Sequence, residues 1–368
     1  MIKSVVVTGA NGFIGRNLSL YLRANKLLNV HEITRSTSYD EITRMISDAE
    51  IVVHLAGANR PDNVEDLQRD NVDFTETLLS LLASVNPIPV IYVSSSQAEL
   101  NNPYGLAKRA AEGLIESYGA NTGSRVSILR LPNVFGKWCR PNYNSVVATF
   151  IHNITRGITL RVDDPDRVIN LAYIDEVVEI IALAADDKLI DHGLRLENVY
   201  RVTLGELAKI VTAIHESRSK GEVLELGGGF LRALYSTYVS ALEPSDFSYE
   251  LVSHVDERGS FTEVLRSPSS GQISFLTVSS GATRGSHYHH SKIEKFVVVA
   301  GSARFRFRSL LNGQAHEIFA TAGAAQVIES APGWVHDITN MEAEELVVLV
   351  WANEVFEPSK PDTYSEKI

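Results

Sequence analysis

The stretch VVVTGANGFIGRNL, residues 5–18, decides the fold of the first part of this chain. A β-branched run ends at Thr8, and Gly9, Gly12 and Gly15 follow before an amphipathic helical pattern begins. Glycines between a strand and a helix let the backbone approach a pyrophosphate, whose charge then faces the helix N-terminus. The spacing alone is weak evidence, but its place between a strand and a helix predicts a dinucleotide cradle.

Strand and helix patterns alternate outward from this turn to about residue 190. Apolar strands that alternate with helices predict an α/β fold, a Rossmann-type doubly wound parallel sheet. The expected strands are 4–7, 30–34, 51–55, 90–94 and 126–129, and the expected helices include 66–85, 104–118 and 206–217.

The pattern changes after about residue 250. Short β-type runs recur between Gly, Pro, Ser and Asn, at 273–278, 295–299, 303–307, 325–328 and 346–351. No helical period appears there, which predicts an all-β barrel. We therefore expect two domains, residues 1–245 and residues 246–368, as the length of 368 residues also suggests.

Composition narrows the function classes. The net charge of −11 comes without a basic stripe, so we expect no nucleic-acid partner. No apolar run approaches the roughly 18 residues that span a bilayer, and the first residues do not resemble a signal peptide. The single cysteine, Cys139, excludes an intrachain disulfide. These features predict a cytoplasmic protein without membrane insertion.

The segment YVSSSQAELNNPYGLAK, residues 92–108, supplies a candidate for proton transfer. Tyr104 and Lys108 are four residues apart on a helix expected to begin near Pro103, so both side chains share one face. A lysine ammonium can lower the pKa of a tyrosine, and a serine at the preceding strand end can orient a carbonyl. Tyr104 can then donate a proton while a nicotinamide supplies hydride.

The end of the second strand bears on the choice of cofactor. An Asp or Glu there would bind the ribose 2′-hydroxyl of NAD, but Thr34 and Arg35 occupy these positions. Arg35 can accommodate a 2′-phosphate, so we expect NADPH. The alternative is a solvated arginine in an enzyme that still accepts NAD.

Several motifs of the first part resemble the extended short-chain dehydrogenases/reductases that act on nucleotide sugars: VVVTGANGFIG, IVVHLAG, NVDFTETLL, PYGLAK, RLPNVFG and RVINLAYIDEV. By this resemblance, Tyr104, Lys108 and either Ser95 or Ser96 are catalytic. The segment between the serines and Tyr104 is shorter than is usual in that family, which leaves both serines as candidates. The resemblance also places His54 in the cleft and implies these cofactor-binding residues: Thr8, Gly9, Gly12, Phe13, Ile14, Gly15, Arg35, Leu55, Ala56, Gly57, Asn71, Lys108 and Asn133.

The segment RGSHYHHSKIEKFVVVAG, residues 284–301, resembles a cupin motif, and APGWVHDITN, residues 331–340, resembles the second one. The ligand set that this resemblance implies is His287, His289, Glu294 and His336. Three imidazoles and a carboxylate suit zinc, iron, manganese or nickel, with zinc as the first expectation.

A competing resemblance concerns the same histidine. VDERGSFTEV, residues 255–264, and RGSHYH are similar to motifs of nucleotide-sugar 3,5-epimerases, in which the histidine matching His287 is a catalytic base without a metal. A purely structural barrel is the third alternative.

Together the two halves resemble the CapF-type capsular polysaccharide biosynthesis enzymes along essentially the whole chain. The resemblance implies a UDP-linked 4-keto-6-deoxy amino sugar as substrate, C3 epimerisation in the cupin domain, C4 reduction in the reductase domain, and a homodimer through the cupin. The alternatives are a single-function ketoreductase with a structural or dimerising cupin, a 4,6-dehydratase and a nucleotide sensor. A dehydratase would need an acidic pair where this chain has only Glu99.

Overall fold

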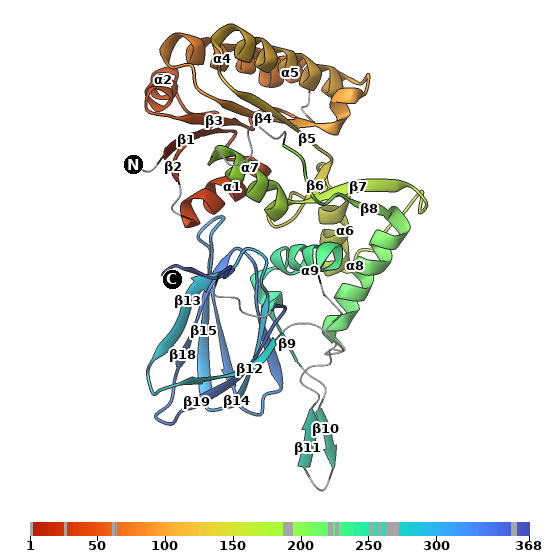
Figure 1. Cartoon of the computed structure of the whole chain (residues 1–368). Helices are drawn as coiled ribbons and strands as arrows, with labels where there is room; N and C mark the ends of the chain where they lie inside the picture. The colour runs from red at the N-terminus through yellow and green to blue at the C-terminus, as the bar shows by residue number, and fades with distance from the viewer. Residues whose placement is uncertain are drawn as a thin grey trace. The chain divides into compact units, whose positions relative to one another are not determined.

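The structure is a computed structural model that forms two compact units. It describes residues 3–25, 28–60, 63, 65–186, 194–219, 224, 228–250, 253–256, 259–262, 272–354 and 359–368 (Figure 1). The first unit comprises residues 1–135, 142–145 and 169–201, and the second comprises residues 136–141, 146–168 and 202–368. The domain boundary at 245/246 stays a prediction. Contacts between residues place some helices that precede this boundary in the same unit as the barrel.

A five-stranded parallel sheet with the order β2-β1-β3-β4-β5 is the centre of the first unit. Its strands are β1 (Lys3–Thr8), β2 (Leu28–Ile33), β3 (Ile51–His54), β4 (Val90–Ser95) and β5 (Val126–Leu131). Helices α1 (Phe13–Ala24) and α7 (Ile174–Ala185) cover one face, and α2 (Tyr39–Ser47), α4 (Phe74–Val85) and α5 (Pro103–Thr122) cover the other (Figure 1). A sheet covered on both faces needs apolar strands, and residues 5–7 are fully buried.

The expected helix over 66–85 is interrupted. A short α3 (Glu65–Leu67) leads into a π-helical turn over Gln68–Asp73, and only then does α4 begin. A π turn inserts one residue into the helical spiral. Such turns are rare and are often found at functional sites. Apolar periodicity does not reveal such an insertion. Here it carries Asn71, a predicted cofactor residue.

The second unit contains an antiparallel β-barrel. Its two sheets have the orders β12-β19-β14-β17-β9 and β16-β15-β18-β13-β20. The strands are β9 (Ser248–Glu250), β12 (Gln272–Val278), β13 (Thr283–Tyr288), β14 (Glu294–Ala300), β15 (Ser302–Ser309), β16 (Ala315–Thr321), β17 (Gln326–Ser330), β18 (Trp334–Asn340), β19 (Leu346–Ala352) and β20 (Tyr364–Ser365). A hairpin of β10 (Ser253–Asp256) and β11 (Gly259–Thr262) precedes β12.

Among the described residues, three α-helices accompany the barrel in this unit: α6 (Val146–Thr155), α8 (Leu204–Ser219) and α9 (Gly229–Ser240). A small sheet of β6 (Asn133–Phe135), β7 (Val168–Tyr173) and β8 (Tyr200–Thr203) completes the described strands. Within the described residues, none of the helices is both long and apolar enough to cross a membrane.

A buried ion-pair cluster joins α8 to the barrel. The carboxylate of Glu329 on β17 lies 2.7 Å from the Lys295 ammonium and 2.8 Å from the Arg218 guanidinium. Lys295 also donates to the Tyr249 hydroxyl at 2.9 Å. Burial would lower the pKa of Lys295, but the attraction of Glu329 raises it well above its ordinary value. Each charge therefore depends on the other for its burial.

Substitution of Glu329 by Gln should destabilise the second unit by about 3–5 kcal/mol, because it leaves two buried cations without their counterion. Unfolding by denaturant can be followed by tryptophan fluorescence, since Trp138, Trp334 and Trp351 all belong to this unit. The matched control is Asp163→Asn, which removes an exposed pair with Arg161 and should cost at most about 1 kcal/mol. Equal stability of the two variants would contradict the role of the cluster.

Candidate active sites

The glycine turn of the first unit has no room for side chains. The N–H of Gly12 donates to the carbonyl of Gly9 at 2.8 Å, and α1 begins directly afterwards. A Cβ atom added to Gly15 would lie 2.3 Å from the Gly9 oxygen and 2.7 Å from the Cα of Ala10. The turn therefore presents bare backbone at a helix N-terminus, the arrangement that accepts a pyrophosphate.

A directional chain of hydrogen bonds lies under this turn. The Thr8 hydroxyl accepts from the N–H groups of Leu55 and Ala56 at 3.1 Å, so it donates its own proton to His54 Nδ1 at 2.7 Å. His54 Nε2 then donates to the Thr75 hydroxyl at 2.8 Å, since Thr75 donates onward to a carbonyl. Burial, together with the charge of Lys108, lowers the pKa of His54 to about 3. His54 is therefore neutral and holds the strand ends.

Asn71 and Lys108 both lie close to Gly57. A Cβ atom added to Gly57 would be 2.4 Å from Asn71 Oδ1 and 3.5 Å from Lys108 Nζ. The amide of Asn71 donates to the carbonyls of Ala58 and Leu67, but its buried Oδ1 has no hydrogen-bond partner among the described residues. An unpaired buried acceptor is costly, so it suits a site that awaits a polar ligand.

Lys108 is held by the sheet rather than by Tyr104, the predicted catalytic tyrosine. Its ammonium donates to the Tyr92 hydroxyl and to the Val93 carbonyl, both at 3.2 Å. Burial lowers the pKa of Lys108 to about 8, although Glu112 opposes this shift. The sequence places Tyr92 on a strand, and nothing in its pattern indicates this contact.

Tyr104 faces Ser95 and Asn59. Burial raises the pKa of Tyr104 above its ordinary value, while hydrogen bonds with the side chains of Asn59 and Ser95 partly offset that rise. The expected lowering of the Tyr104 pKa by Lys108 is wrong for this structure, because burial raises that pKa and Lys108 is not among the groups that shift it. Of the two candidate serines, Ser95 ends β4 and contacts Tyr104, whereas Ser96 is exposed in the next turn.

The remaining predicted cofactor residues lie around the carboxyl ends of the strands. Phe13 and Ile14 are half-buried at the start of α1, and Asn133 is exposed at the start of β6. Arg35 follows β2 with its side chain 90% exposed, and it forms an ion pair with Asp70 at 3.0 Å. The guanidinium can therefore exchange this partner for a ligand with little desolvation cost.

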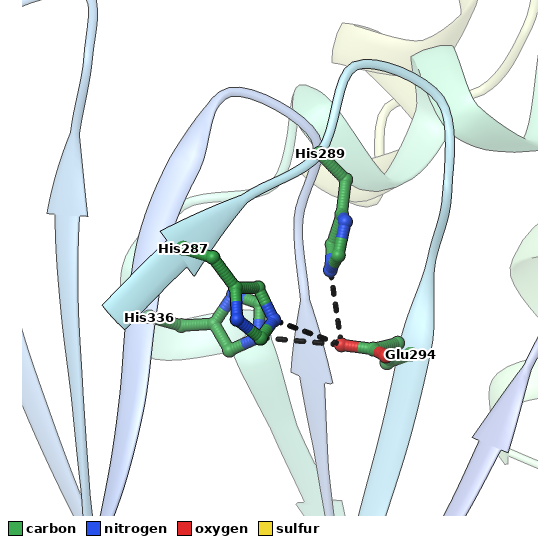
Figure 2. A group of neighbouring side chains, drawn as sticks. All are labelled: His287, His289, Glu294 and His336. Atoms are coloured by element: carbon green, nitrogen blue, oxygen red, sulfur yellow. Dashed lines mark hydrogen bonds and ion pairs between the residues drawn. The ribbon is translucent and has the colours of Figure 1, made fainter. Parts of the chain in front are cut away.

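The second site is a group of four side chains inside the barrel. His287 is on β13, His289 is in the loop after it, Glu294 begins β14 and His336 is on β18 (Figure 2). Their candidate ligand atoms all lie within 4.8 Å of one another. The three imidazoles converge on Glu294 Oε2, at 3.0 Å from His289 Nε2, 3.3 Å from His336 Nε2 and 3.9 Å from His287 Nε2.

A β-bulge aims His287 at this group. The register of β13 against β18 shifts between Gly285 and His287, so that His287 lies opposite His336. Gly285 has a φ of +99°, and a Cβ atom there would lie 3.0 Å from the carbonyl oxygen of His336. The glycine thus permits the close approach of the two strands, and the bulge turns the histidine inward.

The hydrogen bonds of His289 require a cation in the group. Its Nδ1 lies 2.5 Å from the carbonyl oxygen of Asp362, which can only accept, so Nδ1 carries a proton. In a neutral ring, the lone pair of Nε2 would then face the carboxylate of Glu294. Two acceptors 3.0 Å apart are stable only when a proton or a metal ion lies between them.

The group fits a divalent metal. Four ligands about 2.1 Å from a tetrahedral zinc ion lie about 3.4 Å apart, close to the separations between Glu294 and the histidines. Burial would raise the pKa of Glu294, but hydrogen bonds from the three histidines hold it well below its ordinary value. Burial lowers the pKa of His336 to about 4, and Ser330 hydrogen-bonds its other nitrogen at 3.0 Å. A carboxylate and three imidazoles that converge on one point form a ligand set for such an ion.

Two other motifs have different placements. His290 is buried, and its ring packs edge-on against both Tyr288 and Tyr364 with centroids 5.6 and 5.0 Å away, so it is not among the four converging groups. The epimerase-like motif at 255–264 spans β10 and β11. Its residues 257–258 and 263–264 lie outside the described residues.

The sequence did not point to several supporting residues. Asn59 at Tyr104, Thr75 at His54, and Ser330 and Asp362 at the histidines act through contacts that only the folded chain creates. Thr75 lies inside the motif NVDFTETLL but was not among the predicted site residues, and the other three lie outside the motifs quoted above. Asn59 could have been predicted, because it is a short polar residue just after the motif IVVHLAG. Asp362 could not be predicted in this way, since it lies 68 residues after Glu294.

Comparison with protein families divides the chain into two matched segments. Residues 5–195 match the NAD dependent epimerase/dehydratase family, and residues 254–364 match the polysaccharide biosynthesis C-terminal domain. A relative along the full length is a UDP-2-acetamido-2,6-beta-L-arabino-hexul-4-ose reductase of Pseudomonas aeruginosa. It is 46% identical over 363 residues, which cover 98% of each chain.

Solved structures give the same division. The capsular polysaccharide assembling protein CapF of Staphylococcus aureus is 37% identical with a TM-score of 0.66, over 99% of this chain and 100% of that one. The UDP-glucuronic acid 4-epimerase of Bacillus cereus, 19% identical with a TM-score of 0.51, covers 58% of this chain and 84% of its own, and shares the fold. The expected Rossmann-type sheet followed by a cupin barrel is confirmed.

Substitution of Gly15 by Ala should abolish binding of the reduced nicotinamide cofactor, because the added Cβ overlaps the backbone of the turn. Titration of cofactor fluorescence measures the loss. Gly113→Ala is the matched control, since a Cβ there meets nothing within 4 Å and should stabilise α5 by up to about 1 kcal/mol. Unchanged cofactor affinity in Gly15→Ala would contradict the cradle.

Proposed function

The chain belongs to the CapF-type family of nucleotide-sugar reductases, and from that premise we propose that it carries out two reactions on one UDP-linked sugar. It is a nucleotide-sugar 4-ketoreductase of polysaccharide biosynthesis that uses a nicotinamide cofactor. The proposed substrate is a UDP-2-acetamido-2,6-dideoxy-hexos-4-ulose. The cupin domain epimerises C3, and the reductase domain then forms UDP-2-acetamido-2,6-dideoxy-L-talose, on the route to UDP-N-acetyl-L-fucosamine.

The reductase half acts through Ser95, Tyr104 and Lys108. Ser95 orients the C4 carbonyl, because its hydroxyl is beside the Tyr104 phenol at the end of β4. Burial keeps Tyr104 protonated, so the phenol can donate to the developing alkoxide. When bound, NADPH supplies the hydride. The positive charge of Lys108, one helical turn along α5, stabilises the resulting phenolate.

Ketone chemistry fixes the order of the two steps. The hydrogen on C3 is acidic only while C4 is a carbonyl, since the charge left by its removal spreads onto that oxygen. Reduction of C4 ends this acidity, so epimerisation must precede hydride transfer. The two domains are therefore consecutive catalysts, and the barrel acts first.

The observation that carries the barrel's role is the convergence of three imidazoles on Glu294. His289 and His336 are almost fully buried, whereas the side chain of His287 is 24% exposed and can be reached by a substrate. When bound, a divalent metal, with zinc as the first candidate, would act as a Lewis acid toward the carbonyl oxygen on C4, the carbon next to C3. His287 is either its fourth ligand or the group that takes the proton.

Three further parts of the proposal rest on the sequence and on the family. Arg35 is positioned after β2 where it could receive a 2′-phosphate, which favours NADPH. A cytoplasmic location and a homodimer through the cupin domain are expected from composition and from the family resemblance. A single-function ketoreductase with a structural cupin is the alternative, and it leaves the buried carboxylate of Glu294 without a chemical role.

Tyr104→Phe should lower ketone reduction by about 10²- to 10⁴-fold, the usual contribution of a general acid. The variant should still exchange solvent deuterium into C3, as product analysis by NMR would show. His336→Ala is the reciprocal variant: it should lose exchange yet reduce the unepimerised ketone. A Tyr104→Phe protein with a folded barrel and no exchange would refute the division of labour and support the single-function alternative.

Arg35→Ala should lower kcat/KM for NADPH by about 10- to 100-fold, because hydrogen bonds to a charged group contribute about 1.5–3 kcal/mol. The kcat/KM for NADH should be unchanged, since NADH lacks the 2′-phosphate. Arg161→Ala, at a similarly exposed arginine, serves as the control. Equal efficiency of the unaltered enzyme with both cofactors would remove the NADPH assignment.

Purified protein should contain about one divalent metal ion per chain, and a chelator should abolish C3 exchange without preventing ketone reduction. Elemental analysis measures the metal, and NMR measures the exchange. The same analysis of His336→Ala should find the metal lost. Exchange that persists in metal-free protein would leave His287 as a base that works alone.

A further inference from the structure

The segment from residue 359 to residue 368 lies against the histidine site. Its strand β20 pairs with β13, with Ser365 opposite His287 and Tyr364 opposite Tyr288. The Tyr364 and Tyr288 rings stack with their centroids 5.4 Å apart. This segment belongs to neither predicted cupin motif, yet it completes the edge of the sheet that carries His287.

Asp362 in this segment binds the loop that joins His289 to Glu294. One carboxylate oxygen accepts the N–H of His290 at 2.8 Å. The other oxygen accepts the N–H groups of Ser291 at 2.7 Å and Lys292 at 2.6 Å, and the Ser291 hydroxyl at 3.1 Å. Charge-assisted hydrogen bonds to three consecutive amides fix the path of this loop more firmly than neutral partners would.

The same residue fixes the ring of His289. The carbonyl oxygen of Asp362 accepts the Nδ1 proton of His289, which leaves Nε2 as the nitrogen that faces Glu294. Partners of this kind set the tautomer and orientation of metal-binding histidines. One residue therefore controls both the loop and the ring, through its side chain and its main chain.

We propose that Asp362 is a positioning residue of the histidine site, which holds His289 ready to bind a divalent cation. This inference rests on the proposed metal site. It extends the site beyond the two cupin motifs to a residue that no motif includes. Substitution can remove the carboxylate of Asp362. Its main-chain carbonyl would remain, but it would no longer be held in place against His289.

Cobalt(II) is the probe for the test, because its visible absorption bands report the geometry of its ligands. The full chain, freed of metal, is titrated with Co²⁺ as the unaltered protein and as Asp362→Asn, Asp362→Ala and Ser291→Ala. Both Asp362 variants should bind Co²⁺ about 10- to 100-fold more weakly and with altered bands. Asn has the same shape as Asp, but the NH₂ group of its amide would face the N–H groups of the loop, so a donor would meet a donor.

Two controls separate positioning from general damage. Glu366→Gln removes the exposed pair with Arg308 in the same segment and should leave Co²⁺ affinity and bands unchanged. Unfolding of the second unit, followed by tryptophan fluorescence, checks that each variant has folded. Ser291→Ala removes one of the four bonds to the Asp362 carboxylate and should weaken Co²⁺ binding by a few-fold.

The outcomes are distinct. Unaltered Co²⁺ affinity and bands in both folded Asp362 variants would overturn the inference and leave the proposed metal site intact. Failure of the unaltered protein to bind Co²⁺ would overturn the metal site, and the inference with it. If the Asp362 variants do not fold, Ser291→Ala decides, and an unchanged affinity and spectrum in that variant overturns the inference.

Discussion

The histidine site depends on the burial of one carboxylate, that of Glu294. A buried anion is stable only with compensating positive charge, and a neutral imidazole whose Nδ1 is already bonded can offer only a lone pair. The carbonyl of Asp362 puts His289 in that position. The barrel interior is therefore set up for a cation, and the bulge at Gly285 and the segment at 359–368 both maintain this arrangement.

The first unit applies the same rule with neutral groups. The chain from the amides of Leu55 and Ala56 through Thr8, His54 and Thr75 has a single consistent direction, so each buried donor there has an acceptor. It ends at the carbonyl of Asn71, whose side-chain Oδ1 has no hydrogen-bond partner among the described residues. A bound hydroxyl that donates to Asn71 Oδ1 would satisfy this acceptor, so the end of the chain of hydrogen bonds favours ligand binding.

Much of this could be predicted from the sequence, because the informative features are local. The glycine turn, the parallel strands and the Tyr104–Lys108 pair follow from short-range spacing, and the fold is confirmed. The strands β13, β16 and β18 were missed because polar residues and glycine interrupt their apolar pattern; β18 is fully buried yet contains His336, Asp337 and Asn340. The π turn and the role of Asp362 depend on contacts across the fold, and the grouping of α8 with the barrel depends on a buried salt bridge. Periodicity carries none of these.

The register between β14 and β17 limits how these two strands can shift against each other. Glu294 lies opposite Ser330, and Lys295 lies opposite Glu329, so adjacent residues of both strands serve the histidines on one face and the ion cluster on the other. Because side chains alternate along a strand, a slip of one residue would bring an ammonium to the imidazoles and turn the carboxylate away from them. A one-residue shift of β14 against β17 would therefore disrupt the histidine site and the ion-pair cluster together.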